Sequence, residues 1–159
     1  MSEDTARLTG ALSERSGWRA DRCPIARSLG VVGTRSAMLI MREAYYGTTR
    51  FDDFADRVGI TQAVAAARLR ELTDAGLLRR EPYQDPGQRT RFEYRLTEMG
   101  RDLAPAVLGL FDWGSKYLFG DRGAPLTLQH TDCGADIHVT TTCSEGHVVP
   151  LRDMSVTRT

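Results

Sequence analysis

Apolar residues recur at helical spacing over much of residues 24–120 and lose that spacing in the last quarter of the chain. Pro24, suited to the first position of a helix, opens a short apolar segment. Residues 35–47 are apolar around most of the helical circumference, as in a helix at the centre of a core. A buried stripe then runs through 48–59, where Thr49 and Asp52 resemble a capping box. The pattern predicts three successive helices, the second of them central.

A fourth helix is predicted over residues 61–75, separated from the third by a tight glycine-containing turn. Thr61 is suited to the N-cap, and Ala65, Leu69 and Leu72 share one inward face. Two helices joined by such a turn form a helix-turn-helix, which places its second helix in the major groove of DNA.

The sequence after this helix predicts a β-hairpin and then a long helix. Alternating residues form strands over 77–83 and 90–96, with Asp85-Pro86-Gly87 in the tip. The last helix runs over 98–120 and is interrupted or bent near Pro105. A helix-turn-helix followed by a hairpin is a winged helix-turn-helix.

Three parts of the chain follow from these patterns. Residues 1–21 lack a sustained apolar period and are predicted to be a mobile or helical N-terminal arm. Residues 22–120 form the winged helix-turn-helix domain, which ends in a long C-terminal helix. Residues 121–159 are rich in Thr, Val and Gly, and predict a small β-rich appendage. The fold class is therefore α+β and mainly helical.

The composition is that of a soluble globular protein, with 41% apolar and 26% charged residues among 159. No apolar run approaches the roughly 20 residues that span a bilayer, and the acidic N-terminus does not resemble a secretion signal. We therefore expect a cytoplasmic protein with no membrane partner. The net charge is zero, but three Arg against five acids from Asp121 onward leave +2 on the first 120 residues.

Five segments in a fixed order cover roughly residues 22–118: "CPI" at 23–25, "RFDDF" at 50–54, "RLRELTDAGLLRREPY" at 68–83, "RFEYRLTEMGRDLAPAV" at 91–107 and "WG" at 113–114. Together they resemble the HxlR-type winged-helix regulators of bacteria, relatives of the MarR group. The resemblance implies a homodimeric transcription factor that binds double-stranded operator DNA and dimerises mainly through its first and last helices. The chain departs from the family at Gly33-Thr34-Arg35, where Gly-Lys-Trp is common, and at Ala65, where a larger residue is usual.

Arginines around the predicted wing and helices are candidates for phosphate contacts, which supply most of the affinity for DNA. Arg89 and Arg91 flank Thr90 beside the turn of the hairpin. Arg50 lies at the start of the third helix, where free backbone N–H groups favour an anion. Arg68 and Arg70 lie further along the fourth helix. The alternative for these side chains is a solvated face that pairs with neighbouring acids.

Base reading falls to the first turns of the fourth helix. Gln62 can pair bidentately with adenine, and alanine methyls can contact thymine methyls. The predicted readers are Thr61, Gln62 and Ala63, with Ala66 and Ala67 one turn on. So small a set of side chains predicts readout of A·T content, groove shape and half-site spacing. The alternative is a protein-interaction module in which the alanine face meets a partner protein.

Cys23 directly precedes Pro24 and is expected next to a helix N-terminus, where the backbone dipole stabilises a thiolate. Arg22 adds a neighbouring positive charge. In the resembling family, a cysteine at this position is a redox or electrophile sensor in several members, so an oxidant is one candidate effector. The alternative is a buried structural cysteine.

A small molecule is the other candidate effector, in an aromatic pocket between the last helices formed by Phe111, Trp113, Tyr117 and Phe119. At helical spacing, however, such aromatic residues more often form a dimer core than a ligand pocket. No Ser/His/Asp, Cys/His or phosphate-loop constellation occurs in the predicted domain, so we expect no enzymatic activity.

The tail carries His130, Cys133, Cys143 and His147 in the spacing H-x2-C-x9-C-x3-H. Four nitrogen and sulfur ligands can close a tetrahedral structural zinc site, which would stabilise a small β unit without a large core. The spacing matches no standard zinc finger. The alternative is a hairpin in which Cys133 and Cys143 are cross-strand neighbours. We expect no other cofactor.

Overall fold

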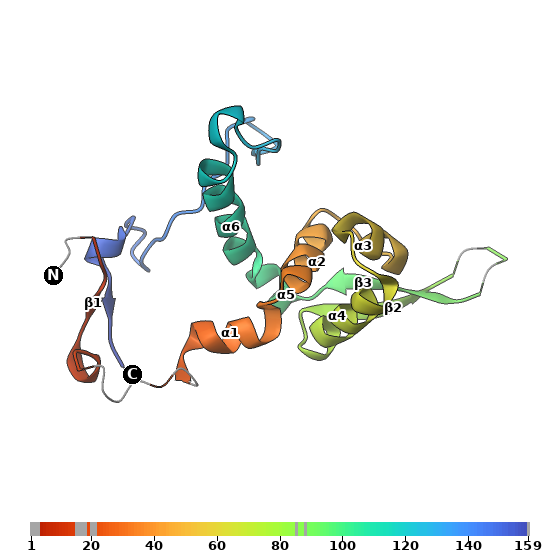
Figure 1. The fold of residues 1–159 in the computed structure, drawn as a ribbon, viewed down its shortest axis with the longest axis horizontal. Helices are drawn as coiled ribbons and strands as arrows, with labels where there is room; N and C mark the ends of the chain where they lie inside the picture. The colour runs from red at the N-terminus through yellow and green to blue at the C-terminus, as the bar shows by residue number, and fades with distance from the viewer. Residues whose placement is uncertain (1–3, 15–18, 20–21, 85, 88, 159) are drawn as a thin grey trace.

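The computed structural model describes residues 4–14, 19, 22–84, 86–87 and 89–158. Figure 1 shows a winged-helix body from which two helices and the chain ends extend. The elements in chain order are β1 (Arg7–Leu8), η1 (Gly10–Leu12), α1 (Pro24–Val32), α2 (Arg35–Tyr45), α3 (Phe51–Val58), α4 (Gln62–Asp74), β2 (Leu78–Tyr83), β3 (Arg91–Leu96), α5 (Glu98–Asp102), α6 (Ala104–Tyr117), η4 (Gly120–Arg122), η5 (Leu151–Asp153) and β4 (Ser155–Val156).

One hydrophobic core lies between α2, α3, α4 and the start of the hairpin. Its largest fully buried side chains come from all four elements: Ile40, Met41, Phe54, Leu69, Leu72 and Leu78. The prediction that residues 35–47 form the central helix is confirmed, because α2 contacts α3, α4, α6 and β3.

The helix-turn-helix between α3 and α4 is held by local backbone chemistry. Gly59 ends α3 with φ +69°, a left-handed conformation that a side chain would strain. Thr61 is the N-cap of α4, and its side chain accepts a hydrogen bond from Val64 N at 3.3 Å. Ala65 is fully buried, so α4 lies close against its neighbours. These predictions from the sequence are confirmed.

The capping box predicted at Thr49 is wrong. The N-cap of α3 is Arg50, and its side chain makes no capping hydrogen bond. Thr49 is used instead to join this loop to β3: its carbonyl accepts from Tyr94 N at 2.8 Å, and its side chain hydrogen-bonds to Glu93. A contact distant in sequence has therefore replaced the local cap.

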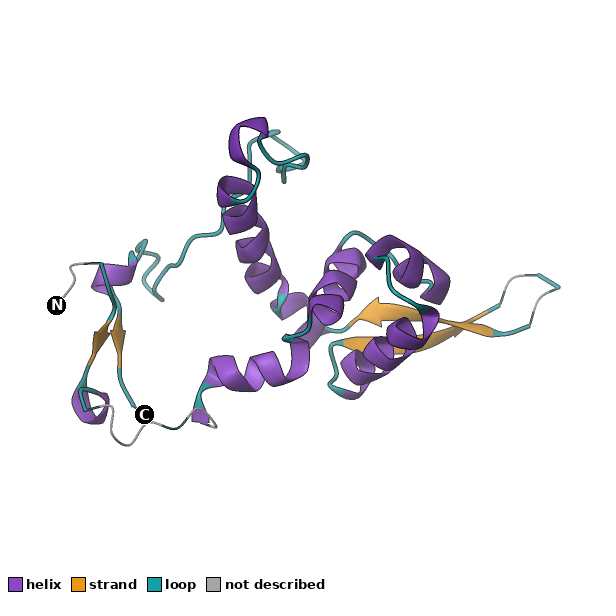
Figure 2. Ribbon diagram, in the orientation of Figure 1, coloured by secondary structure: helices purple, strands orange, loops and turns teal. Residues whose placement is uncertain are grey.

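The wing is an antiparallel hairpin of β2 and β3 that extends away from the body (Figure 2). Its register pairs Leu78 with Leu96 and Tyr83 with Arg91, within one residue of the predicted strands. After the wing, the last helix is divided at Leu103 into α5 and α6, with Pro105 in the first turn of α6. The interruption predicted near Pro105 is confirmed.

Two helices expose apolar side chains instead of burying them. Every residue of α1 except Val32 is exposed, and α6 contains no buried residue. Figure 1 shows α1 and α6 projecting from the body in different directions. No helix among the described residues is both long and apolar enough to cross a membrane.

The two chain ends pair with each other, far from the winged-helix body (Figure 2). β1 and β4 are parallel, with Arg7 opposite Ser155 and Leu8 opposite Val156. The described part of the N-terminal arm thus contains a strand and one 3-10 turn, where the sequence predicted a mobile or helical segment. The described tail forms short isolated bridges between loops, without a sheet of its own.

Candidate nucleic-acid interface

The exposed face of α4 consists mainly of short side chains. Because Ala65, Leu69 and Leu72 point inward, the 100° advance per residue places Ala63 and Arg70 on the outer face. Gln62, Ala63, Ala66 and Arg70 are exposed, and Ala67 is half-buried. A helix with this face can lie close to another surface, because no long side chain holds it away.

A groove of about 560 Å³ lies between this alanine face and the wing. Two arginines, Arg70 from α4 and Arg80 from β2, lie along it. Its remaining lining residues are Ala63, Ala66, Ala67, Thr73, Asp74 and Tyr94. The groove therefore combines apolar methyl groups with guanidinium groups, a surface suited to base edges and phosphates.

Arg68 and Arg70 lie on different sides of α4, although the sequence predicted both as phosphate contacts. The Arg68 side chain is 31% exposed and forms an ion pair with Glu71. Its Nε is buried without a hydrogen-bond partner among the described residues. Arg70 is exposed beside the groove, so the structure favours Arg70 over Arg68 for a contact with a ligand.

The arginines of the wing divide into paired and unpaired groups. Arg79 pairs with Glu81 at 2.5 Å, and Arg95 with Glu93 at 2.7 Å. The hydrogen bond from Arg95 lowers the pKa of Glu93, so this carboxylate stays charged. Nearer the tip, Arg89 and Arg91 are exposed and form no ion pair with another described residue. Their charge is available to a ligand.

Two further cations are oriented by aromatic rings. Arg50 Cζ lies 3.3 Å from the ring centroid of Tyr83, and Arg80 Cζ lies 3.7 Å from that of Phe92. A guanidinium stacked in this way keeps its N–H donors free at its edge. Sequence reasoning missed Arg80, although a hairpin centred on Gly87 places it opposite Tyr94 and on the face of Phe92.

A model of the HxlR-like helix-turn-helix family matches residues 31–121. The chain belongs to this family. The HTH-type transcriptional regulator Rv3095 of Mycobacterium tuberculosis (strain ATCC 25618 / H37Rv) is 44% identical over 110 residues, which cover 69% of this chain and 68% of that protein. The HTH-type transcriptional regulator YdeP of Bacillus subtilis (strain 168) is 35% identical over 96 residues, which cover 60% of this chain and 73% of YdeP.

Solved structures agree with the family match. The crystal structure of PA1607 superposes with a TM-score of 0.77 at 34% identity and covers 87% of this chain and 96% of PA1607. The redox regulator HypR in its reduced form gives a TM-score of 0.55 at 33% identity, over 60% of this chain and 94% of HypR. The predicted winged helix-turn-helix fold and its resemblance to HxlR-type regulators are confirmed.

In this HxlR-like protein Cys23 occupies the predicted place at a helix start. It is the N-cap of α1, with Pro24 at the first helical position, and its side chain makes no capping hydrogen bond. Its thiol is free and half-buried. The neighbouring Arg22 and Arg27 are exposed.

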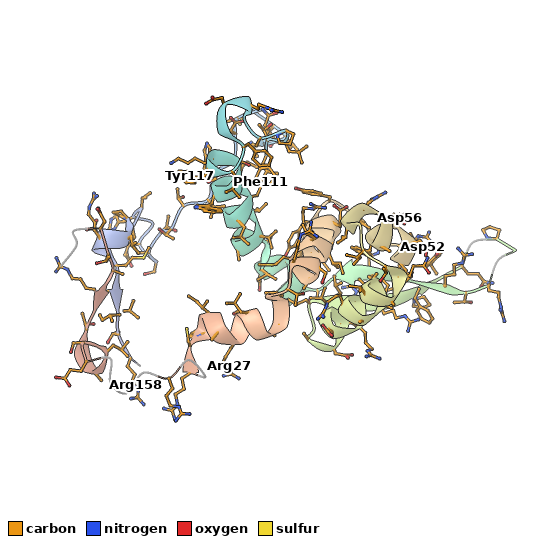
Figure 3. All side chains as sticks on the ribbon, in the orientation of Figure 1. Arg27, Asp52, Asp56, Phe111, Tyr117 and Arg158 are labelled. Carbon is orange, nitrogen blue, oxygen red and sulfur yellow. The ribbon has the colours of Figure 1, made fainter. Side chains whose placement is uncertain are left out.

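Of the four predicted pocket aromatics, only Phe111 lines the cavity beside α6. This HxlR-like protein has a cavity of about 710 Å³ between α6 and residues 124–140 of the tail. Asp112 anchors the tail there, with its Oδ1 atom 3.2 Å from His138 Nδ1. The hydrogen bond from His138 lowers the pKa of the Asp112 carboxyl. Figure 3 shows Phe111 and Tyr117 on different sides of α6.

The four tail residues predicted as zinc ligands form two separate pairs. His130 Nδ1 lies 3.2 Å from Cys133 Sγ, and His147 Nδ1 lies 3.6 Å from Cys143 Sγ. Among the described residues, no three His, Cys, Asp or Glu side chains converge as a metal site would require. The bridges Gln129–Asp136 and Thr142–Val148 enclose one cysteine each, so Cys133 and Cys143 are not cross-strand neighbours.

Proposed function

We propose that this HxlR-like protein is a cytoplasmic homodimer that regulates transcription by binding operator DNA. The observation that carries the proposal is the groove between α4 and the wing, where exposed alanines adjoin Arg70 and Arg80. In this arrangement α4 enters the major groove, and the wing follows the neighbouring backbone or minor groove.

The side chains divide between reading and positioning. Thr61, Gln62, Ala63 and Ala66 face the base edges from the first turns of α4, where Gln62 pairs with adenine. Phosphates are bound by cations at the N-cap of α3, on α4 and on the wing: Arg50, Arg70, Arg80, Arg89 and Arg91. Because the side chains that face the base edges are short, the spacing of two half-sites and the shape of the DNA determine much of the specificity for the operator.

The homodimer is built on the exposed apolar faces of α1 and α6. A monomer rarely leaves so much apolar surface on two helices uncovered, and a twofold dimer would bury it against the same surface of the partner. The resemblance to HxlR-type regulators, which implies a dimer contact through the first and last helices, supports the use of α1 and α6. The exposed apolar residues on them and just after α6 are Ile25, Leu29, Val31, Leu110, Trp113, Tyr117, Leu118 and Phe119.

Selection from a random duplex library with the purified protein tests this function. We expect enrichment of an inverted repeat whose half-sites are about 10 base pairs apart, one helical turn. Binding of the enriched duplex should fall steeply with salt. If no sequence is enriched and binding shows no salt dependence, the alanine face serves a protein partner instead.

Oxidant sensing through Cys23 is a second candidate function. The proposal rests on a free, half-buried thiol at the N-cap of α1, next to Arg22 in the sequence and one turn from Arg27. The relative HypR is described as a redox regulator with reduced and oxidised forms. An oxidised Cys23 would alter α1 and, through it, the proposed dimer.

Cys23→Ser is expected to remove the sensitivity of DNA binding to diamide. Treatment of the unchanged protein should lower or raise operator affinity severalfold, with recovery on reduction. Cys133→Ser and Cys143→Ser are the matched controls, because their thiols are exposed in the tail and should leave the response intact. An equal diamide response with and without Cys23 excludes this cysteine as the sensor.

A further inference from the structure

The cavity between α6 and the tail has no role in the proposed DNA binding. Its volume of about 710 Å³ lies within the range of roughly 300–1,000 Å³ that is typical of sites for small molecules. Residues from 124–128 and 136–140 form the tail wall, and α6 forms the other wall. Most of the lining lies beyond residues 31–121, so the match to the HxlR-like family does not account for this cavity.

Specific contacts hold the tail wall against α6. Asp112 Oδ1 lies 3.2 Å from His138 Nδ1, and Asp112 Oδ2 accepts a hydrogen bond from Val139 N at 3.4 Å. The hairpin that precedes this contact is closed by Ile137 N, which donates to Leu128 O at 2.8 Å. The cavity is therefore built by the fold of the tail and its attachment to the helix.

The cavity and the proposed dimer surface lie on opposite sides of α6. At 100° per residue, the side chains of Phe111 and Trp113 point about 200° apart around the helix. Figure 3 likewise shows Phe111 and Tyr117 on different sides of α6. A ligand in the cavity would therefore leave the apolar surface of the proposed dimer free.

Apolar side chains supply the hydrophobic part of the lining. They are Phe111, Leu126, Leu128, Ile137 and Val139. Leu126 is 60% exposed and Ile137 is 42% exposed, although both border a concave surface. Exposed apolar side chains that gather at a hollow are typical of a ligand site. This part of the lining fits an aromatic ring or a branched chain.

The carboxylates in the lining already accept hydrogen bonds. Asp112 is engaged by the tail through His138 and Val139 N. Asp136 Oδ1 accepts from Gln129 Nε2 at 3.2 Å, across the bridge that joins these two residues. A cationic ligand would have to compete with these contacts.

Lys116 gives the α6 wall a cation that an anionic ligand can reach. It is exposed and forms no ion pair with another described residue. Its Nζ lies 5.0 Å from the ring centroid of Tyr117 and hydrogen-bonds to this residue. An ammonium has three donors, so this contact leaves others for a ligand. The neighbouring Ser115 adds a hydroxyl to the same lining.

We infer that the cavity binds an amphipathic organic anion, whose apolar part lies between α6 and the tail and whose carboxylate pairs with Lys116. The Ser115 hydroxyl donates a second hydrogen bond to the carboxylate. Because such a ligand contacts both walls, it stabilises the tail in its docked position. The inference does not depend on the proposed DNA binding, since no lining residue lies on α4 or the wing.

Isothermal titration calorimetry with phenylbutyrate and its neutral amide, phenylbutyramide, tests the site. We expect the acid to bind the unchanged protein about tenfold more tightly than the amide, as one hydrogen bond between charged groups would contribute. In Lys116→Gln the two compounds should bind equally, because the variant keeps a long polar side chain but no charge. Arg122→Gln is the matched control: it removes an exposed cation just after α6 that is not part of the lining, so the difference should persist.

His138→Ala tests the other wall. Loss of the contact with Asp112 should loosen the tail and weaken the binding of both compounds alike, because Lys116 is unchanged.

Three results would overturn the inference. If the acid and the amide bind the unchanged protein equally, or if Lys116→Gln keeps the difference, Lys116 does not bind the anion. If His138→Ala binds both compounds as the unchanged protein does, the tail is not a wall of the site. If neither compound binds at millimolar concentration, the cavity takes no such anion, and a segment of the partner subunit would be the better occupant.

Discussion

Leu29→Glu is expected to convert the protein to a monomer and to weaken operator binding about 10²- to 10⁴-fold, the usual gain from linking two binding sites. Leu29 is 57% exposed on α1, one turn from Ile25, which is 71% exposed. Burying both in the proposed dimer removes apolar area from water. A glutamate there would carry an unpaired charge into the interface, which is strongly unfavourable.

The measurement is molar mass by light scattering together with titration of the selected duplex. Arg27→Glu is the matched control, because Arg27 lies about 200° around α1 from Leu29 and extends from the lower side of the helix in Figure 3. It should remain a dimer with little change in thermal stability. If Leu29→Glu is still dimeric, α1 does not contribute to the interface, and the proposed assembly is wrong.

The body of the fold was predictable because its signals are local. Thr61 and Thr97 cap helices through their own side chains, and Gly59 ends α3 in a left-handed conformation. The buried faces of α2, α3 and α4 follow the apolar period of each segment. Such features depend on residues within about one helical turn, so the sequence displays them directly.

The features that were missed depend on contacts between distant segments. Thr49 forms hydrogen bonds with Glu93 and Tyr94 of β3 and does not cap α3. β1 and β4 pair although nearly the whole length of the chain separates them in sequence. A strand of two residues is too short for its local sequence to indicate which segment it pairs with. The direction of an exposed side chain also depends on such distant contacts, so the sequence does not indicate it.

In the candidate site, the sequence identified the helix and the wing but could not separate the roles of their arginines. Arg68 and Arg70 are close in sequence, yet one pairs with Glu71 and the other borders the groove. Arg80 became visible only when the hairpin register placed it against Phe92. Which cations are free to bind DNA is a property of the folded charge pattern.

Replacing Arg89 and Arg91 together by alanine is expected to weaken binding to every duplex by about 10²- to 10³-fold at moderate salt. Each side chain occurs twice in a dimer, so up to four phosphate contacts are lost, at about 1 kcal/mol each. The plot of log affinity against log salt should become shallower by about 3.6, or about 0.9 per phosphate. Titrations of selected and unrelated duplexes at several salt concentrations measure both quantities.

Two controls separate phosphate binding from other effects. Arg79→Ala lies on the same hairpin but removes a guanidinium already paired with Glu81, so the salt slope should hardly change. Gln62→Ala should keep the slope and reduce only the preference for the selected sequence, by about 1–3 kcal/mol per adenine read. If the double arginine variant keeps the full slope, the wing does not contact phosphates. The alanine face of α4 would then lack the neighbouring cations that make it a DNA-binding surface, and a protein partner would be the better explanation.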